Sequence, residues 1–115
     1  MFVTRLPDAT EHARDGLVSK LLVGQEGSVA RLTVTWVVVD PDREQAPHAH
    51  ESEQVYVVVH GTGRMQVESE SADLAAGDAV WIPGGIRHGI ENTGRGQLVY
   101  VTAATPAMDV SRFYG

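Results

Sequence analysis

The chain has 115 residues, with nine Lys and Arg against fifteen Asp and Glu, and a formal net charge of −6 at pH 7. This length suits one domain with one modest core. A hydrophobic content of 43% excludes a fully disordered chain. The 17 valines, 12 glycines and 5 prolines largely exclude an all-helical protein, because β-branched residues fit pleated sheets while Gly and Pro interrupt helices.

Several classes of function are disfavoured by what the sequence lacks. Cysteine is absent, so no disulfide, thiolate metal site or cysteine nucleophile can form. The acidic balance and the scattered arginines argue against a nucleic-acid partner. No apolar stretch reaches the roughly 18 residues of a membrane helix, and residues 1–10 lack the apolar segment of a signal peptide. We therefore expect a cytoplasmic protein with neither a nucleic-acid nor a membrane partner.

The first third of the chain predicts one clear strand. Residues 1–15 are mixed and polar, residues 16–23 favour a strand or a short helix, and residues 24–28 favour a turn. Residues 29–40 show an alternation that is typical of a strand with one buried apolar face. The apolar parity comprises Ala30, Leu32, Val34, Trp36 and Val38, and the other parity carries Arg31, Thr33 and Thr35.

Short strands separated by turns fill the rest of the chain. Residues 41–47 are expected to form a loop, and strands are predicted at 54–60, 64–68, 72–76, 79–82, 87–91 and 97–102. A strand roughly every 8–12 residues with glycine-bearing turns favours an antiparallel sandwich or barrel. We expect an all-β single domain over residues 1–115, with its core at about 29–104 and an N-terminal arm or edge strand within 1–28.

Histidines carry the strongest chemical signal in the sequence. His48 and His50 are two residues apart, so they point the same way on an extended strand, and Gln54 keeps that parity if no bulge intervenes. His88 follows a Pro-Gly-Gly turn much later in the chain. Two donors from one strand and one from a neighbouring strand could hold a metal ion. The alternative is that His48 and His50 are solvent-facing loop residues.

The residues around these histidines form two longer motifs. From His48 the sequence reads HAHESEQVYVVVHG, and from Gly77 it reads GDAVWIPGGIRHGIEN. They resemble the signature motifs of the cupin superfamily, His-x-His-x3-Glu-x6-Gly and Gly-x5-Pro-x-Gly-x2-His-x3-Asn. The second matches at every fixed position, and the first departs only where Gln54 replaces glutamate. The resemblance implies a double-stranded β-helix (jelly-roll) barrel holding one divalent metal ion through His48, His50, Gln54 and His88.

The donor set bears on the metal and its reactivity. Three nitrogens and one oxygen suit Fe(II), Mn(II), Ni(II), Cu(II) and Zn(II). Because the amide of Gln54 is neutral, the ion would keep about two positive charges and would attract an anionic substrate or deprotonate bound water. Two alternatives stay open: Gln54 stands back from the metal, or Glu53 reaches it through a bulge.

Other residues are candidates for the wall of the site. Tyr56 shares the inward parity and is a weak candidate for orienting a substrate, with plain core packing as the alternative. His60 and Arg87 are expected outside the ligand set. The candidates for an apolar pocket wall, each of which could equally be a core residue, are Met65, Trp36, Ile82, Ile90 and Tyr100.

The resemblance implies a metal-dependent enzyme acting on a small molecule, either a dioxygenase or an isomerase, cyclase or lyase that uses the metal as a Lewis acid. The alternatives are a non-catalytic metal-dependent barrel that binds or senses a sugar or other metabolite, and a barrel that has lost its metal and only self-assembles. Small cupins commonly pair through sheet edges and an N-terminal strand, so we expect a homodimer in which residues 16–23 take part. Phe113 and Tyr114 are expected to dock on a partner or to fray.

Overall fold

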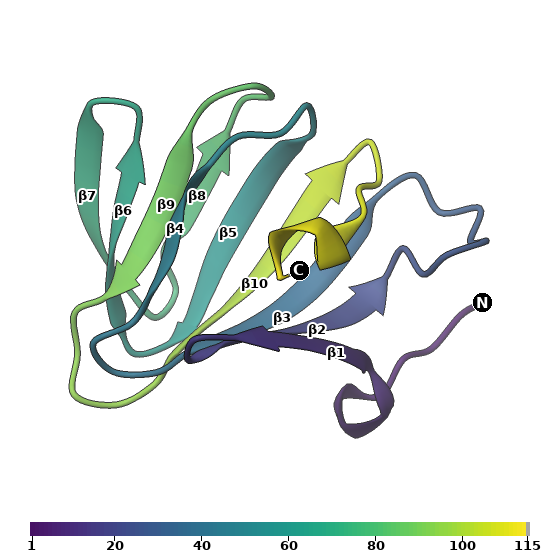
Figure 1. The fold of residues 1–115 in the computed structure, drawn as a ribbon, viewed down its shortest axis with the longest axis horizontal. Coiled ribbons are helices and arrows are strands. Elements are labelled where there is room, and N and C mark those ends of the chain that lie inside the picture. The colour runs from purple at the N-terminus through teal and green to yellow at the C-terminus, as the bar shows by residue number, and fades with distance from the viewer. Residues whose placement is uncertain (115) are drawn as a thin grey trace.

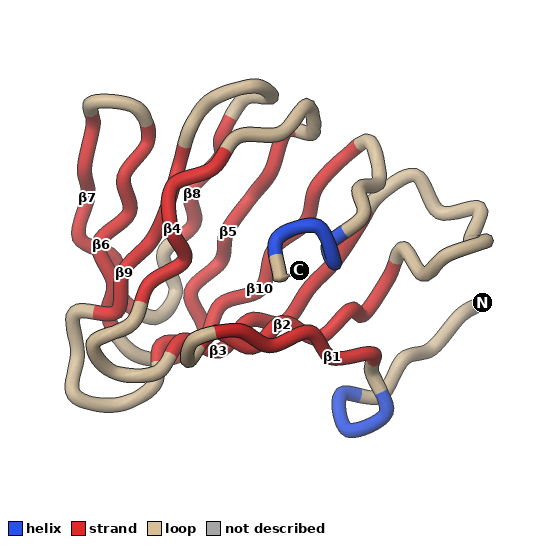
Figure 2. The backbone as a smooth tube through the Cα atoms, in the orientation of Figure 1, coloured by secondary structure: helices blue, strands red, loops and turns tan. Residues whose placement is uncertain are grey.

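The computed structural model describes residues 1–114 and is built almost entirely from strands, with two short 3-10 helices (Figures 1 and 2). None of the helices in this range is long and apolar enough to cross a bilayer. The elements are η1 (Leu6–Asp8), β1 (Thr10–Arg14), β2 (Leu17–Val23), β3 (Thr33–Val39), β4 (Glu44–His48), β5 (Glu53–His60), β6 (Thr62–Val67), β7 (Glu70–Ala75), β8 (Ala79–Ile82), β9 (His88–Asn92), β10 (Leu98–Thr105) and η2 (Val110–Phe113).

The strands form two antiparallel sheets that face each other across the core. The six-stranded sheet has the order β1-β2-β3-β10-β5-β8, and the four-stranded sheet has the order β4-β9-β6-β7. Inward side chains from both sheets fill the space between them, the largest fully buried ones including Tyr56, Met65, Ile82, Ile90 and Tyr100. The predicted all-β, double-sheet jelly roll of a single domain is confirmed.

The N-terminal segment is integrated into the larger sheet. Leu17–Val23 is a strand, not a helix, and it pairs with β1 on one side and with β3 on the other. Both of its hydrogen-bonding edges are therefore occupied. A further strand, β4, spans Glu44–His48. The sequence predicted a loop over residues 41–47.

The orientation of β3 is opposite to the prediction. Its buried side chains are Thr33, Thr35, Val37 and Val39, whereas Val34, Trp36 and Val38 are half-buried on the outer face. The inner face of β3 is partly polar. Its Thr35 lines a cavity between the sheets, where the hydroxyls of Thr35 and Thr102 hydrogen-bond at 2.5 Å. Trp36 is therefore not a wall of the pocket, and the apolar parity of this strand lies on the outside of the barrel.

Candidate metal centre

Histidines from two sequence regions converge at one end of the barrel. His48 ends β4, His50 lies in the loop that follows, and His88 begins β9. One ring nitrogen from each lies within 4.8 Å of the others. The ring centroids are 4.5 Å apart for His48 and His88, and 5.0 Å apart for His50 and His88. The structure thus brings together the three histidines that the motifs indicated.

The loop that carries His50 is fixed by the Pro-Gly-Gly turn before His88. The backbone N–H of Gly85 donates to the carbonyl of His50 at 2.7 Å. A Cβ on Gly84 would collide with the carbonyl oxygen of Glu51, so only glycine allows the two loops this close approach. The glycines of the second motif therefore position a histidine of the first.

All three imidazoles are held in the same tautomer. Each Nδ1 lies within hydrogen-bond distance of a backbone carbonyl two residues away, at 2.9 Å for His48 and at 2.8 Å for both His50 and His88. A carbonyl oxygen only accepts, so each Nδ1 carries a proton, and Nε2 is the nitrogen that a neutral ring would offer to a metal ion. The carbonyls belong to Ala46, Ser52 and Ile86 respectively.

Burial keeps two of these rings neutral. His88 is 1% exposed, and removal from water lowers its pKa to about 4, an effect that the neighbouring His48 and His50 reinforce. Burial also lowers the pKa of His48, again with a contribution from His50. Neutral imidazole is the form that binds a metal ion, so both rings are ready to bind metal at neutral pH.

Gln54 completes the cluster from the opposite sheet. It lies on β5 and is 4% exposed. Its Oε1 is 3.0 Å from Nε2 of His50 and 3.3 Å from Nε2 of His88. The amide oxygen therefore lies close to two ring nitrogens at once. With neutral rings, these three atoms are electron-pair donors that suit a divalent first-row metal.

The cluster differs from the sequence-based picture in two details. His48, His50 and Gln54 do not share one strand, because the chain leaves the four-stranded sheet at His48 and enters the six-stranded sheet at Glu53. Glu53 points away from the cluster, and its exposed carboxylate accepts a hydrogen bond from Trp81 Nε1 at 3.1 Å. Gln54, not Glu53, is therefore the fourth side chain beside the histidines.

Gln45 is a residue of the site that the sequence did not reveal. Its Oε1 accepts hydrogen bonds from the hydroxyls of Tyr56 at 2.7 Å and Tyr100 at 3.0 Å. Because the amide oxygen is engaged by both tyrosines, the NH2 group is turned to the cavity, which Gln45 lines together with His48 and Gln54. Within residues 1–114 that NH2 group donates no hydrogen bond to another side chain.

A β-bulge in β4 explains why the sequence did not predict that Gln45 faces the site. Gln45 pairs with Ile90 and His48 pairs with His88, so three residue steps on β4 match two on β9. The extra residue reverses the alternation, and both side chains face inward despite their odd separation. Gly89 makes this possible, since a Cβ there would lie 2.9 Å from both the Gln45 carbonyl oxygen and the Pro47 nitrogen. No feature of a segment predicted as a loop signals this.

The two tyrosines beside Gln45 are fully buried. Tyr56 and Tyr100 are each 0% exposed, and their rings stack with centroids 4.9 Å apart. Burial raises the pKa of both well above the ordinary value. They therefore remain protonated donors to Gln45 at neutral pH.

The other residues considered for the wall of the site fall into two groups. Met65, Ile82 and Ile90 are buried in the core, and His60 and Arg87 are exposed.

The C-terminal turn closes the cavity next to the histidines. The ring of Phe113, in η2, lies 5.0 Å from that of His48 and 6.0 Å from that of His50. Tyr114 stacks on His12 of β1 at 5.9 Å, so η2 bridges β4 and β1 across the mouth between the sheets (Figure 1). The enclosed cavity measures about 20 Å³, which is about the space of one water molecule.

Known proteins were compared with the chain and its fold. The family model of the cupin domain matches residues 35–104. An RmlC-like cupin from Shewanella frigidimarina superposes with a TM-score of 0.80 at 23% identity, covering 95% of this chain and 94% of that one. A predicted oxalate decarboxylase from Thermotoga maritima gives 0.81 at 20% identity, with coverages of 92% and 99%. The polyketide cyclase RemF from Streptomyces resistomycificus gives 0.77 at 20% identity, with coverages of 91% and 79%.

A curated sequence also matches part of the chain. The uncharacterized protein MJ1618 of Methanocaldococcus jannaschii is 33% identical over 60 residues, which are 51% of this chain and 48% of that protein. The chain thus spans about half the length of this relative. The solved structures above share too little sequence to show more than the fold. The family model, however, covers more than half of the chain, and its range contains all four side chains of the cluster. The chain belongs to the cupin family.

Proposed function

We propose that the protein is a metal-dependent enzyme that binds one divalent ion through His48, His50, Gln54 and His88 and converts a small, oxygen-bearing molecule beside it. The observation that carries this proposal is the clustering of one ring nitrogen from each of the three histidines with the Gln54 amide oxygen, which lies 3.0 Å from Nε2 of His50 and 3.3 Å from Nε2 of His88. A bound ion would supply Lewis acidity, and a redox-active one would also supply positions for dioxygen.

The charge of the site favours an anionic or enolisable ligand. All four donors are neutral, so none of them offsets the charge of a divalent ion. Among residues 1–114, no carboxylate, lysine or arginine lines the cavity, whose polar lining consists of Ser19, Thr35, Gln45, His48, Gln54, Thr102 and Tyr114. A ligand that brings one negative charge on oxygen would be attracted here, and a cationic one would be repelled.

Gln45 supplies the contact that would orient such a ligand. Tyr56 and Tyr100 hold its amide oxygen, so the NH2 group stays aimed into the cavity without reorganisation when a ligand arrives. A hydrogen bond from this group to a ligand oxygen would fix the second end of a molecule whose first end lies at the metal. Preorganised donors of this kind are the usual means by which a mostly apolar pocket selects its ligand.

The reaction class follows from the scarcity of proton-transfer groups. The tyrosines beside Gln45 have raised pKa values, and burial likewise raises the pKa of Tyr114, so none acts as a base at neutral pH. Dioxygenation demands the least from such side chains, whereas metal-assisted isomerisation, cyclisation or lyase chemistry would need metal-bound water as its source and acceptor of protons. Structural relatives described as a predicted oxalate decarboxylase and a polyketide cyclase are compatible with this range.

A second candidate is a non-catalytic barrel that binds or senses a small metabolite. It is favoured by the position of Phe113 over the cavity. Both candidates share the metal site, so they differ only in whether a bound molecule is changed.

One series of measurements tests the metal and separates the candidates. Protein purified without chelators is analysed for metals, loaded with Fe(II), Mn(II) or Zn(II), and mixed with a panel of enolic and phenolic compounds. Dioxygen consumption with an oxygenated product supports a dioxygenase, and an isomerised or cyclised product under argon supports Lewis-acid chemistry. Tight binding without product supports the binding barrel. Failure of the protein to bind any divalent metal overturns both the enzyme proposal and the binding-barrel proposal.

A further inference from the structure

The segment that follows β10 separates two hollows at the mouth of the barrel. We call residues 106–114, which include η2, the C-terminal strap. Met108 and Val110 of the strap line the inner cavity of about 20 Å³ and also an outer cleft of about 610 Å³. The outer cleft is lined as well by His12 of β1 and Leu21 of β2. The strap is therefore the wall between cleft and cavity, and its displacement would join them.

Few hydrogen bonds attach the strap to the barrel. Within residues 1–114, its backbone hydrogen bonds are local to η2 and its ends, so its hydrogen-bonded attachment comes from two side-chain hydroxyls. Thr33 on β3 accepts from the N–H of Met108 at 2.9 Å and lies 3.3 Å from the carbonyl of the same residue. Ser52 donates to the carbonyl of Pro106 at 2.5 Å. A segment with so few attachments opens more readily than the strands beneath it.

Ser52 connects the strap to the metal centre. It lies two residues after His50 and is 3% exposed. Its carbonyl oxygen accepts a hydrogen bond from Nδ1 of His50 at 2.8 Å, and its hydroxyl donates to Pro106. One buried residue thus contacts a candidate metal ligand through its backbone and the strap through its side chain. A second contact runs in parallel, since the ring of Phe113 lies beside those of His48 and His50.

Metal binding would act on these contacts at the ring of His50. An imidazole whose Nε2 is bound to a cation is a stronger donor at Nδ1–H, so its hydrogen bond to the Ser52 carbonyl is strengthened. With His48, His50 and Gln54 held together, the loop that carries Ser52 has little freedom left. The Ser52 hydroxyl is then fixed where it meets the carbonyl of Pro106. Docking the strap costs less entropy against a fixed partner than against a mobile one.

We propose that metal binding fixes the C-terminal strap through His50, Ser52 and Pro106, so that the strap is a metal-controlled gate between the outer cleft and the inner cavity. The gate rests on the metal site of the proposed function. In the metal-free protein the strap opens more often, and the two hollows join. In the metal-loaded protein it stays docked over the histidines. Because the coupling between two equilibria is reciprocal, the docked strap also raises the affinity for the ion.

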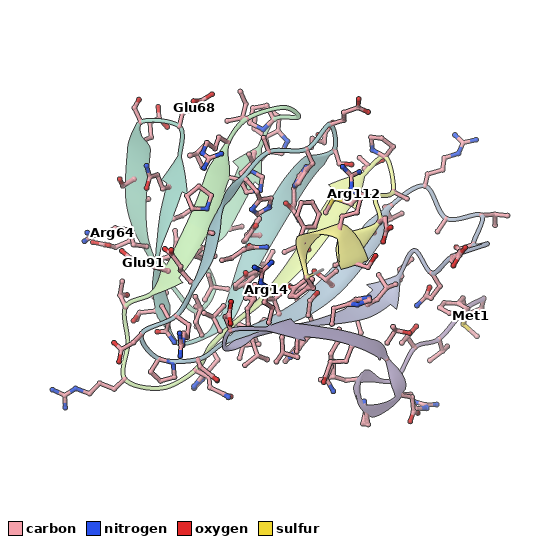
Figure 3. The ribbon with its side chains drawn as sticks, in the orientation of Figure 1. Met1, Arg14, Arg64, Glu68, Glu91 and Arg112 are labelled. Carbon is pink, nitrogen blue, oxygen red and sulfur yellow. The ribbon has the colours of Figure 1, made fainter. Side chains whose placement is uncertain are left out.

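Hydrogen–deuterium exchange of the full chain, followed by mass spectrometry of peptides from residues 106–114, tests the gate. The metal-free protein is compared with protein loaded with Zn(II) or Mn(II). The metal should slow exchange of the strap about tenfold, within the usual range of coupling between two sites. The N–H of Met108 is the most informative amide, because the Thr33 hydroxyl protects it in the docked strap. Trypsin should also cut more slowly after Arg112, an exposed residue of η2 (Figure 3).

Two variants separate the path through Ser52 from the general attachment of the strap. Ser52→Ala keeps all four candidate metal donors and should bind metal stoichiometrically, with an affinity lowered by no more than the coupling factor, while the slowing by metal falls to about twofold. Thr33→Val removes an anchor outside the metal loop. It should speed strap exchange with and without metal and keep the ratio between the two states. Ser71→Ala, at an exposed position on β7, is the matched control and should behave like the wild type.

Calorimetry separates failure of the gate from failure of the metal site. A wild type that binds none of Fe(II), Mn(II) and Zn(II) overturns the metal site and the gate together. A wild type that binds metal with unchanged strap exchange overturns the gate alone, and this comparison requires no variant. A Ser52→Ala protein that keeps the wild-type ratio overturns the path through Ser52. Circular dichroism confirms that each variant is folded.

Discussion

His48 and His88 are direct partners across the β4–β9 ladder, and their rings lie 4.5 Å apart. The pair sits where both strands meet the loops at one end of the four-stranded sheet, and Gln54 approaches it from the six-stranded sheet. A metal ion held here therefore joins the two sheets as well as two segments of the chain. Metal binding should stabilise the fold as a whole, since any ligand that binds only the folded state does so.

The first prediction concerns the metal itself. His88→Ala removes one of the converging lone pairs, and it should abolish stoichiometric metal and remove the rise in melting temperature that Zn(II) or Mn(II) gives the wild type. Mass-spectrometric metal analysis and thermal denaturation measure the two effects. His60→Ala is the control, because His60 is exposed at the end of β5 and should leave both unchanged. Full occupancy in the His88→Ala protein would refute the ligand set.

The second prediction uses the residue that departs from the family motif. Gln54→Glu replaces a neutral oxygen donor with a charged one at the same position, so metal affinity should rise by about tenfold, which corresponds to about 1.4 kcal/mol. The residual charge of the site falls by one, so binding of small anions to the loaded protein should weaken. Titration calorimetry measures both. Gln54→Leu should lower metal affinity, and equal affinity in all three proteins would mean that Gln54 stands back from the metal.

The third prediction concerns the pH dependence of the metal-free protein. Burial lowers the pKa of His88 to about 4 in the folded state, against about 6.5 in an unfolded chain. Below about pH 6.5, His88 takes up a proton in the unfolded chain but not in the folded protein. The free energy of unfolding therefore falls as the pH drops from about 6.5 to 4. The loss is at most about 3 kcal/mol for this group, and the lowered pKa of His48 acts in the same direction.

Urea denaturation of chelator-treated protein at several pH values measures this dependence. Acidic residues contribute to the slope as well, so the informative quantity is the difference between the wild type and His88→Gln. The variant should show a shallower loss of stability between pH 6.5 and 4. Identical slopes would mean that His88 is protonated as easily in the folded protein as in the unfolded chain.

The fourth prediction separates ligand orientation from metal binding. Gln45→Leu removes the NH2 group that faces the cavity and should keep the metal, because Gln45 is not among the converging donors. Affinity of the loaded protein for a small anion should fall by about tenfold, close to the value of one hydrogen bond to a charged group. Tyr56→Phe and Tyr100→Phe should each produce a smaller loss, since each removes only one hydrogen bond that holds Gln45 in place. A Gln45→Leu protein with unchanged ligand affinity would contradict the assigned role.

The sequence predicted which four side chains lie together, and it predicted the buried faces of the strands less well. Motif spacing identified His48, His50, Gln54 and His88 because the turns between them, such as the one at Gly84, tolerate few other residues. Gln45 was missed because the bulge in β4 breaks the alternation on which parity arguments rest. The predicted buried face of β3 is the wrong one. Alternating apolar residues indicate that one face of a strand is apolar, but they do not show whether that face lies inside or outside the barrel. In this strand Thr35 lines the cavity between the sheets, and Trp36 faces outward.

The last prediction concerns access to the site. Phe113 lies over His48 and His50, and the enclosed cavity of about 20 Å³ cannot hold more than about one water molecule. We therefore expect η2 to move aside when a ligand larger than water enters the cavity. Phe113→Ala should enlarge the cavity and raise the association rate of a small ligand, measured by stopped-flow fluorescence, while metal content stays unchanged. Arg112→Ala is the matched control on the same turn, because its side chain is exposed, and its association rate should equal that of the wild type. An unchanged rate in Phe113→Ala would mean that ligands reach the histidines by a route that does not pass beneath this ring.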